Sequence, residues 1–334
     1  MHMKKTTKII IGIIVAIALI LAIYLLLNSK SNFVSNPKTV KVGVSYITSM
    51  SVIEDVKNGI ISGFKTAGYE DGKNIIFDFQ NAQGDNSTNV AIAQKFANSG
   101  YDLFIPITTP SSQALANLIK NKPIVFSTVS DPISAGLVKS ESSPLGNITG
   151  VKDAALYKES LELILKIVPN TKKIGIVYNP GESNSQFSIN QLQNYADKMG
   201  LEIITAPANN TNEILAAARS IANKIDVFLM TADNTVVSGQ EALIKVALEN
   251  QKPMLAYEQT GVEKGALAAL GTNYEKLGER TAEMAVRVIK GENPGNMPII
   301  GVTEANLFIN TTTAQKIGVN FSQDLINQAK QIYK

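Results

Sequence analysis

The chain has 334 residues, of which 45% are hydrophobic and 18% are charged, and its formal net charge is +3. This length suits two lobes better than one core, and the composition is typical of a globular protein. Cysteine is absent and the single histidine is His2, so disulfides, cysteine nucleophiles, Ser-His-Asp catalysis and most zinc sites are excluded. No basic stripe stands out in the body of the chain, which argues against nucleic acid as a partner.

The N-terminus predicts export. Residues 1–8 are a short basic segment with Lys4, Lys5 and Lys8, expected in the cytoplasm. Residues 9–27 are an unbroken apolar run that is long enough, as a helix, to cross the hydrocarbon core of a membrane. No Ala-x-Ala-like cleavage site follows, so we expect a retained transmembrane anchor, with a cleaved signal sequence as the alternative. Residues 28–39 would then be a polar tether.

The first half of the exported part alternates short buried strands with helices. Strands are expected over residues 41–47, 75–79, 103–107 and 124–127, and helices over 53–67, 90–98 and 111–120. Such alternation predicts an α/β fold with a parallel, doubly wound sheet.

The same pattern returns downstream. Residues 173–178 (KIGIVY) repeat residues 41–46 (KVGVSY), residues 225–228 repeat 101–104, and residues 251–254 repeat 121–124. Three matches in one order and at nearly one spacing indicate two similar lobes. We assign residues 40–150 and 273–300 to lobe 1, and residues 151–272 and 301–334 to lobe 2. Helices are expected over 157–168 and from 274 to about 290, and one strand and two short helices end the chain. Twin lobes of this kind form a cleft that opens and closes.

Parallel α/β sheets bind ligands outside the carboxyl ends of their strands. In this chain those positions are small and polar. The candidate ligand-binding residues are Ser45, Tyr46, Thr48, Thr108, Thr109, Ser111, Ser127, Thr128, Val129 and Asp131 in lobe 1, and Asn179, Asn184, Ser185, Asp233, Asn234, Tyr257 and Glu258 in lobe 2. Taken singly, residues such as Thr109 and Asp233 would serve equally well as helix caps.

The chemistry of these positions favours a zwitterion. Residues 108–112 (TTPSS) open a helix, whose free N–H groups suit a carboxylate better than a phosphate because no lysine or glycine-rich loop accompanies them. Asp131, Asp233 and Glu258 are candidates for the opposite charge. Tyr46, Tyr257 and Tyr274 could supply an aromatic wall or a cation–π face, although ordinary partial burial is slightly favoured for Tyr274. We interpret Glu182 as a solvated loop charge.

The ordered motifs of the exported part resemble a known family. KVGVSYI, PITTPSSQA, IVFSTVSDPISAGLV, NITGV, YNPGESNS, TADNTVVSG and LGERTAEMAVRVIKGENP, between about Lys41 and Gln331, resemble ABC-transporter solute-binding proteins of the tryptophan/tyrosine (TrpX-like) group. The resemblance implies a type I periplasmic-binding-protein fold, with two Rossmann-like lobes joined by three hinge crossings. It also implies an aromatic amino acid as the ligand, no cofactor, and permease and ATPase subunits as partners.

The same resemblance suggests roles for single segments. The PITTPSS and STVSDP segments would hold the carboxylate of the ligand, and Asp233 is our choice for its amine. Many Gram-positive relatives carry a lipobox cysteine, which this chain lacks. The membrane helix would therefore replace the lipid as the anchor, and the protein would be extracytoplasmic, or secreted if cleaved.

Three other functions are weaker. A ligand-sensing ectodomain that acts through a membrane partner shares the fold, but only about eight residues precede the apolar run, too few for an output domain. A repressor of the sugar-operon type would need a helix-turn-helix where the anchor lies. An enzyme would depend on paired carboxylates, and no motif supports that. We therefore expect a binding protein and no enzyme.

Overall fold

A computed structural model describes residues 10, 12–13, 15–24, 39–153, 156–302 and 304–334. The chain divides into two compact units, residues 1–39 and residues 40–334. In the first unit, residues 15–24 are helical. Among the described residues, no helix is both long enough and apolar enough to cross a membrane. The expected basic segment and most of the expected tether lie outside the described residues, as do residues 9, 11, 14 and 25–27 of the expected anchor.

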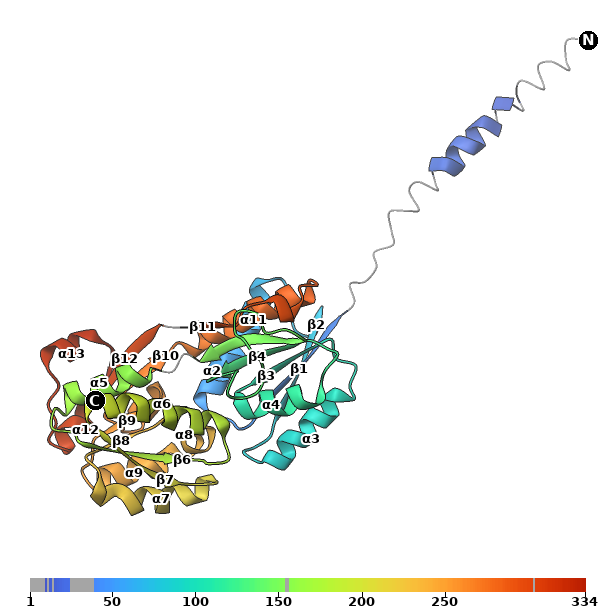
Figure 1. The fold of residues 1–334 in the computed structure, drawn as a ribbon. Helices are drawn as coiled ribbons and strands as arrows, with labels where there is room; N and C mark the ends of the chain where they lie inside the picture. The colour runs from blue at the N-terminus through green and yellow to red at the C-terminus, as the bar shows by residue number, and fades with distance from the viewer. Residues whose placement is uncertain (1–9, 11, 14, 25–38, 154–155, 303) are drawn as a thin grey trace, which may run out of the picture. The chain divides into compact units, whose positions relative to one another are not determined.

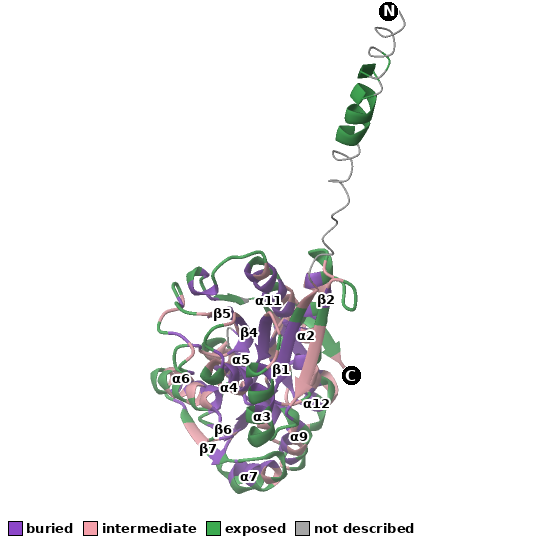
Figure 2. Ribbon diagram, turned by 90° about the vertical axis from the view of Figure 1, so that its right-hand side faces the viewer, coloured by how far each residue is buried: buried purple, intermediate pink, exposed green. Residues whose placement is uncertain are grey.

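The second unit contains a six-stranded, fully parallel sheet (Figure 1). Its strand order is β11-β5-β4-β3-β1-β2, with β1 (Val40–Tyr46), β2 (Ile75–Asn81), β3 (Leu103–Ile107), β4 (Ile124–Val129), β5 (Ile148–Asp153) and β11 (Ile300–Val302). One face packs against α2 (Ser51–Thr66) and α11 (Tyr274–Ile289), and the other against α3 (Asn86–Ala97) and α4 (Thr109–Leu118). We call these elements lobe 1. In Figure 2 the central strands β1 and β4 are buried, whereas much of α3 is exposed.

The remaining elements of the second unit form lobe 2, around a seven-stranded sheet in the order β13-β12-β10-β9-β8-β6-β7. The strands are β6 (Lys173–Tyr178), β7 (Glu202–Pro207), β8 (Val227–Leu229), β9 (Met254–Ala256), β10 (Ala268–Thr272), β12 (Ala305–Asn310) and β13 (Ala329–Tyr333). One face packs against α5 (Tyr157–Ile167), α6 (Ser183–Met199), α12 (Thr311–Lys316) and α13 (Gln323–Gln328), and the other against α7 (Ile214–Ile221), α8 (Asn234–Ser238), α9 (Gln240–Glu249) and α10 (Gln259–Glu263). Three 3₁₀ turns complete the second unit: η1 (Thr211–Glu213), η2 (Ala222–Lys224) and η3 (Pro294–Asn296).

The expected two-lobed α/β architecture is confirmed, with two differences. β12 runs antiparallel to β10 in an otherwise parallel sheet, and the C-terminal region holds strands β11, β12 and β13 where one strand was expected. The chain passes from the first sheet to the second after β5, returns after β10 and passes over again after β11. β5 continues to Asp153 in the first sheet. The exact residues at which the lobes divide remain a prediction.

The repeated sequence motifs have repeated structural roles. Asp102 accepts a hydrogen bond from the second backbone N–H of β1 at 3.0 Å, and Asp226 accepts one from the first N–H of β6 at 2.8 Å. The ammonium groups of Lys122 and Lys252 each donate to the carbonyl just before that aspartate, at 2.9 and 2.7 Å. Each lobe therefore fixes the start of its first strand with the same aspartate and lysine, which explains why the sequence repeats them.

Lobe 1 depends on a close contact between α2 and α11. A Cβ atom at Gly59 would lie 2.0 Å from the backbone oxygen of Glu275, and one at Gly278 would lie 2.1 Å from that of Val56. No side chain fits at those distances, so glycine is required where the two backbones meet. The contact sets the position of the N-termini of both helices.

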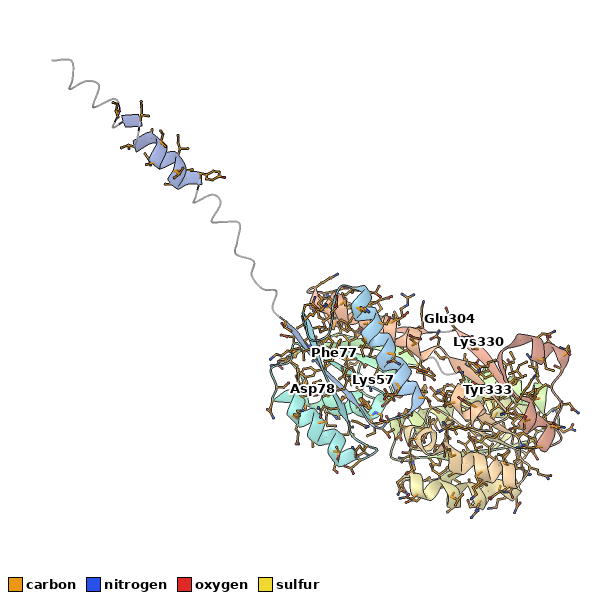
Figure 3. All side chains as sticks on the ribbon, turned by 180° about the vertical axis from the view of Figure 1, so that it is seen from behind. Lys57, Phe77, Asp78, Glu304, Lys330 and Tyr333 are labelled. Carbon is orange, nitrogen blue, oxygen red and sulfur yellow. The ribbon has the colours of Figure 1, made fainter. Side chains whose placement is uncertain are left out.

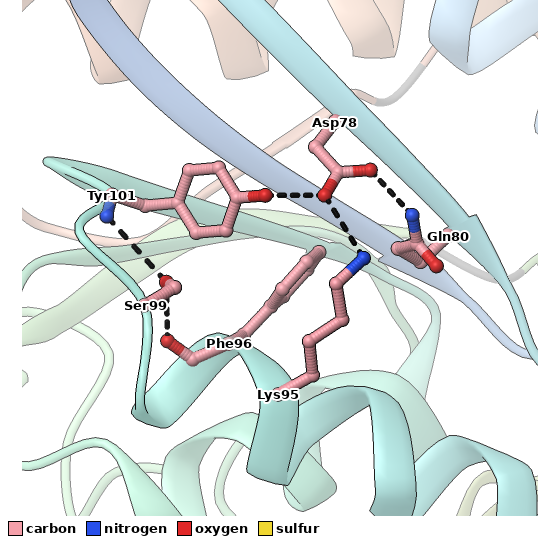
Figure 4. A network of polar contacts seen from close by, with 6 residues as sticks. All are labelled: Asp78, Gln80, Lys95, Phe96, Ser99 and Tyr101. Carbon is pink, nitrogen blue, oxygen red and sulfur yellow. Dashed lines mark hydrogen bonds and ion pairs between the residues drawn. The ribbon is translucent and has the colours of Figure 1, made fainter.

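The outer strand β2 is held by polar contacts on one side (Figure 4). Asp78 accepts hydrogen bonds from Tyr101 and Gln80 and from Lys95 of α3, the last at 3.3 Å. Partial burial alone would raise the pKa of Asp78, but these donors hold it below its ordinary value. Burial and the bond to Asp78 raise the pKa of Tyr101 to about 12. The network ties β2 to α3.

Two other side chains fix edges of the lobes, and both are labelled in Figure 3. Lys57 of α2 places its ammonium 5.1 Å from the ring centre of Tyr46, and it also pairs with Glu54 at 2.8 Å. The hydroxyl of Tyr333, in β13, accepts a hydrogen bond from Gln259 of α10 at 2.7 Å. The last strand is thereby attached to a helix next to the lobe interface.

Candidate functional site

A small cavity lies between the lobes, at the carboxyl ends of β3, β4 and β8. We call it the cleft cavity. It is lined by Met50, Val52, Ile53, Thr108, Thr109, Thr128 and Ser130 of lobe 1 and by Asn184, Ala232, Asp233, Asn234, Val237 and Tyr257 of lobe 2.

The lobe 1 side of the cleft cavity is suited to an anion. α2 begins after Met50 and α4 after Thr108, and neither residue caps its helix with a side-chain hydrogen bond. Uncapped helix N-termini present free N–H groups and partial positive charge. The hydroxyl oxygens of Thr108 and Thr109 are also buried without a hydrogen-bond partner. Two helix ends and two free hydroxyls are therefore directed at the same cavity.

The backbone on this side is strained. Thr108 has a φ of 72° and Thr128 a φ of 58°, although both are β-branched residues for which positive φ is unfavourable. Each such residue costs about 1–3 kcal/mol, and such residues gather at ligand sites. Both threonines line the cleft cavity, so the strained backbone forms part of the cavity wall.

The lobe 2 side carries a buried carboxylate, Asp233. One of its oxygens caps α8 by accepting from the N–H of Val236 at 2.8 Å, and the other accepts from the N–H of Asn179 at 2.5 Å and the hydroxyl of Ser185 at 2.6 Å. Burial raises the pKa of Asp233 to about 7, and the nearby charge of Glu182 adds to the rise. A cation in the cavity would favour the ionised carboxylate and so oppose this rise.

Glu182 is not a solvated loop charge, so that interpretation is wrong. Its side chain is buried and accepts from the backbone N–H groups of Asn234 and Thr235, each at 3.0 Å, and from the side-chain amide of Asn184 at 3.0 Å. The helix end of α8 thus compensates for its burial. The side-chain amide of Asn184 donates one hydrogen bond to Glu182 and one to the carbonyl of Ala232. Its oxygen is buried without a hydrogen-bond partner at the cleft cavity.

A second small compartment adjoins the cleft cavity, with which it shares Ala232 and Tyr257. We call it the side compartment. Its other lining residues all belong to lobe 2 and are mostly apolar: Leu156, Tyr157, Ser160, Leu192, Leu229, Met230, Thr231, Ala256 and Leu270. The hydroxyl oxygen of Thr231 is buried there without a partner. The charged groups therefore lie at the cleft cavity, and most of the apolar surface lines the neighbouring side compartment.

A buried carboxylate with two tyrosine partners joins the lobes beside these cavities. Asp153, at the end of β5, accepts hydrogen bonds from the hydroxyls of Tyr257 and Tyr274, the latter at 3.4 Å. Burial raises the pKa of Asp153 to about 6, even though both hydrogen bonds oppose the rise. Within the described ranges, no group of three or more histidine, aspartate or glutamate side chains is placed to hold a metal ion.

Residues 41–333 match a family described as ABC transporter substrate binding protein. The chain belongs to this family. It is 38% identical over 294 residues to a tyrosine-binding protein of Clostridioides difficile (strain R20291), which covers 88% of this chain and 85% of that protein. The resemblance to TrpX-like solute-binding proteins is thus confirmed.

Two solved structures with more than 30% sequence identity are similar to this chain. The ABC domain from Streptococcus pneumonia in complex with L-Trp has a TM-score of 0.85 at 32% identity and covers 88% of this chain and 100% of that one. The ligand-free, open structure of a substrate-binding protein with adhesive properties from Clostridium difficile has a TM-score of 0.68 at 36% identity, and covers 88% and 99%. A solute-binding protein from Bacillus halodurans, 15% identical, shares the fold alone, with a TM-score of 0.60.

The structure brings many of the predicted site residues of this substrate-binding protein together. Those that line the cleft cavity are Thr108, Thr109, Thr128, Asn184, Asp233, Asn234 and Tyr257. Thr48 and Asn179 line a neighbouring groove, which shares Asn234 with the cavity. Whether each of them touches a ligand stays a prediction.

Other predicted residues make structural contacts. Ser127 bonds Thr281 of α11 at 2.8 Å, and Ser111 bonds Asn89 at 3.2 Å. Asp131 accepts from the N–H of Ser134 at 2.5 Å in a turn, Glu258 caps α10, and Ser185 bonds Asp233. Ser45, Tyr46 and Val129 are buried within lobe 1. These contacts occupy the polar atoms of most of this set, so their contribution to binding remains a prediction.

Sequence reasoning missed most of the side compartment. Tyr157, Leu192 and Met230 are apolar or aromatic residues of helices and strands, and their pattern is the same as that of core residues. Met50 and Ile53 were missed too, although they stand at the start of a helix that follows a strand. That position is the one signal that could have identified them.

Proposed function

We propose that the protein is the extracellular substrate-binding component of an ABC importer and captures an aromatic amino acid as a zwitterion. The observation that carries this proposal is the arrangement of charge across the cleft cavity. Two uncapped helix N-termini of lobe 1 lie on one side of the cavity. On the other side, the buried carboxylate Asp233 lies in the lobe 2 wall, and the buried carboxylate Glu182 lies beside that wall. An α-carboxylate and an α-ammonium on one carbon match both sides.

The ligand's carboxylate would lie on lobe 1, against the N–H groups that open α2 and α4 and the hydroxyls of Thr108 and Thr109. Its ammonium would donate to the unpaired oxygen of Asn184. Asp233 already accepts three hydrogen bonds. We therefore infer that it supplies charge beside the ammonium, and that Asn184 supplies the direct contact.

The side chain of the ligand would enter the side compartment. This space is lined mainly by leucine, alanine and methionine and by the ring of Tyr157, and it opens from the cleft cavity beside Ala232 and Tyr257. An apolar wall with aromatic neighbours suits an aromatic ring. The tyrosine-binding relative and the L-Trp complex support the same ligand class.

The lobes would close on the ligand and open to release it. At similar identity, this chain is more similar to the L-Trp complex than to the open, ligand-free structure, with TM-scores of 0.85 and 0.68. The difference supports a closed arrangement of the two lobes here. The three passages of the chain between the lobes would act as the hinge.

Partners and location follow from this role. A permease and an ATPase of an importer would receive the ligand, and the apolar run of residues 9–27 would hold the protein at the outer face of the membrane. Capture and release require no bond-breaking group, so we propose no enzymatic activity.

A thermal-shift screen of the full-length protein against the twenty amino acids and common nucleosides tests the proposal. A ligand at about a hundred times its dissociation constant adds about 2.7 kcal/mol of stability. A selective rise of the melting temperature with tryptophan, tyrosine or phenylalanine is expected. A rise only with nucleosides or aliphatic amino acids would contradict the ligand class.

A further inference from the structure

Among the described residues that line the side compartment, one fully buried side-chain polar atom has no hydrogen-bond partner. The hydroxyl oxygen of Thr231 is buried without a hydrogen-bond partner, and the residue as a whole is only 4% exposed. Thr231 lies two residues after the end of β8 and lines the compartment together with leucines and alanines. A buried hydroxyl without a partner is unfavourable unless something else bonds it.

The hydroxyls of the two tyrosines that line the compartment, Tyr157 and Tyr257, already make hydrogen bonds. Tyr157 and Ser188 share a hydrogen bond of 3.0 Å between their hydroxyl oxygens, and Ser188 also donates to the carbonyl of Asn184 at 2.8 Å. Burial raises the pKa of Tyr157 above its ordinary value, so this hydroxyl stays neutral. Thr231 therefore offers a fully buried and unpaired hydroxyl at the apolar wall, two residues before the carboxylate Asp233.

We infer that Thr231 determines ligand specificity, and that its hydroxyl selects aromatic side chains with a ring O–H or N–H over phenylalanine. The inference rests on the proposed function. The donor of a tyrosine or tryptophan ring would bond the Thr231 oxygen inside the compartment. Phenylalanine would fill the same apolar space and leave that oxygen unpaired and without water. A site built around a hydrogen bond discriminates strongly against an analogue that lacks it.

The test is isothermal titration of the full-length wild type and three variants with L-tyrosine, L-tryptophan and L-phenylalanine. The wild type should bind the better of tyrosine and tryptophan at least about tenfold more tightly than phenylalanine. Thr231→Val, which has the same shape without the hydroxyl, should lose most of this preference. Thr231→Ser should restore it. Thr205→Val, at an exposed position of β7, is the matched control and should behave as the wild type.

The melting temperature of the ligand-free protein distinguishes a loss of specificity from a general loss of folding. Because Thr231 makes no side-chain hydrogen bond in the described structure, Thr231→Val should not lower the melting temperature of the ligand-free protein. Equal affinities for the three amino acids in the wild type would overturn the inference and leave the proposed function standing, as would an unchanged preference in Thr231→Val. Binding of none of the three would overturn the proposed function and the inference with it.

Discussion

The hydroxyl of Tyr257 donates a hydrogen bond to the carboxylate of Asp153. Tyr257 follows β9 of lobe 2 and lines both the cleft cavity and the side compartment, whereas Asp153 ends β5 of lobe 1. One buried bond thus connects the lobes at the wall of the candidate site. A ligand that packs on the Tyr257 ring would contact a residue that also holds the lobes together.

Tyr257→Phe removes this bond and leaves Asp153 with Tyr274 as its hydroxyl donor. Loss of a partner by a buried polar group costs about 1–3 kcal/mol, so the free energy of unfolding should fall by that amount. Urea denaturation measures it. The control is Tyr69→Phe, because Tyr69 packs edge-on against Phe64 and its hydroxyl has no hydrogen bond in the described structure. Equal stability of Tyr257→Phe and wild type would contradict the prediction.

The stability of the ligand-free protein should fall as pH rises from about 5 to about 7. Burial raises the pKa of Asp153 to about 6 and that of Asp233 to about 7, against about 3.9 for aspartate in an unfolded chain. In this window the folded state therefore binds more protons than the unfolded state, so unfolding becomes easier with rising pH. Urea midpoints between pH 5 and 8 measure the effect, and Asp153→Asn should flatten the lower part of the curve. A midpoint that rises over this interval would rule the explanation out.

Ligand binding should release a proton below pH 7. An ammonium beside Asp233 favours the ionised carboxylate and lowers its pKa, so affinity should increase as pH rises from about 5.5 to 7.5, by at most about tenfold per pH unit. Titration calorimetry at pH 6 in two buffers with different ionisation enthalpies counts the protons. Asp233→Asn should weaken binding and remove the pH dependence. Proton uptake by the wild type would show that the ammonium lies elsewhere.

Asn184→Ala should weaken amino-acid binding by about ten- to a hundredfold, because a hydrogen bond to a charged group contributes about 1.5–3 kcal/mol. The unpaired oxygen of Asn184 is the acceptor that we assign to the ammonium. Calorimetry gives the affinity. The melting temperature of the ligand-free variant shows how much stability is lost with the bond to Glu182. Asn190→Ala, at an exposed position of the same helix, is the control. Similar affinities for the two variants would exclude Asn184 as the contact.

The order of elements could be predicted because strand and helix periodicity is local. The expected strand over residues 103–107 matches β3, and the expected helix over 157–168 ends one residue beyond α5. The start of α3 was missed by four residues, since the apolar pattern begins at Val90 but Asp85 caps the helix through the N–H of Thr88 at 2.6 Å. β13 was missed because its sequence, AKQIY, mixes polar and apolar residues at an exposed sheet edge.

The candidate site could be predicted only where it is polar. Thr108 stands directly after β3 and Asp233 four residues after β8, and position alone identified them. Glu182 was misjudged because the N–H groups that bond its buried carboxylate, those of Asn234 and Thr235, lie some fifty residues further along the chain. Tyr157 and the leucines of the side compartment have the pattern of a core, and only the fold leaves a space beside them.

Gly278→Ala should destabilise lobe 1 and weaken ligand binding together. The new methyl group would lie 2.1 Å from the carbonyl oxygen of Val56, so α2 and α11 must separate. Overpacking of this kind costs about 1–3 kcal/mol, and the shift would move the N-terminus of α2, which lines the cleft cavity at Met50. Urea denaturation and calorimetry measure the two effects. Gly100→Ala, where a Cβ atom would meet nothing within 4 Å, is the control. If Gly278→Ala loses stability but keeps its full affinity, the position of α2 does not control the anion-binding side of the cleft.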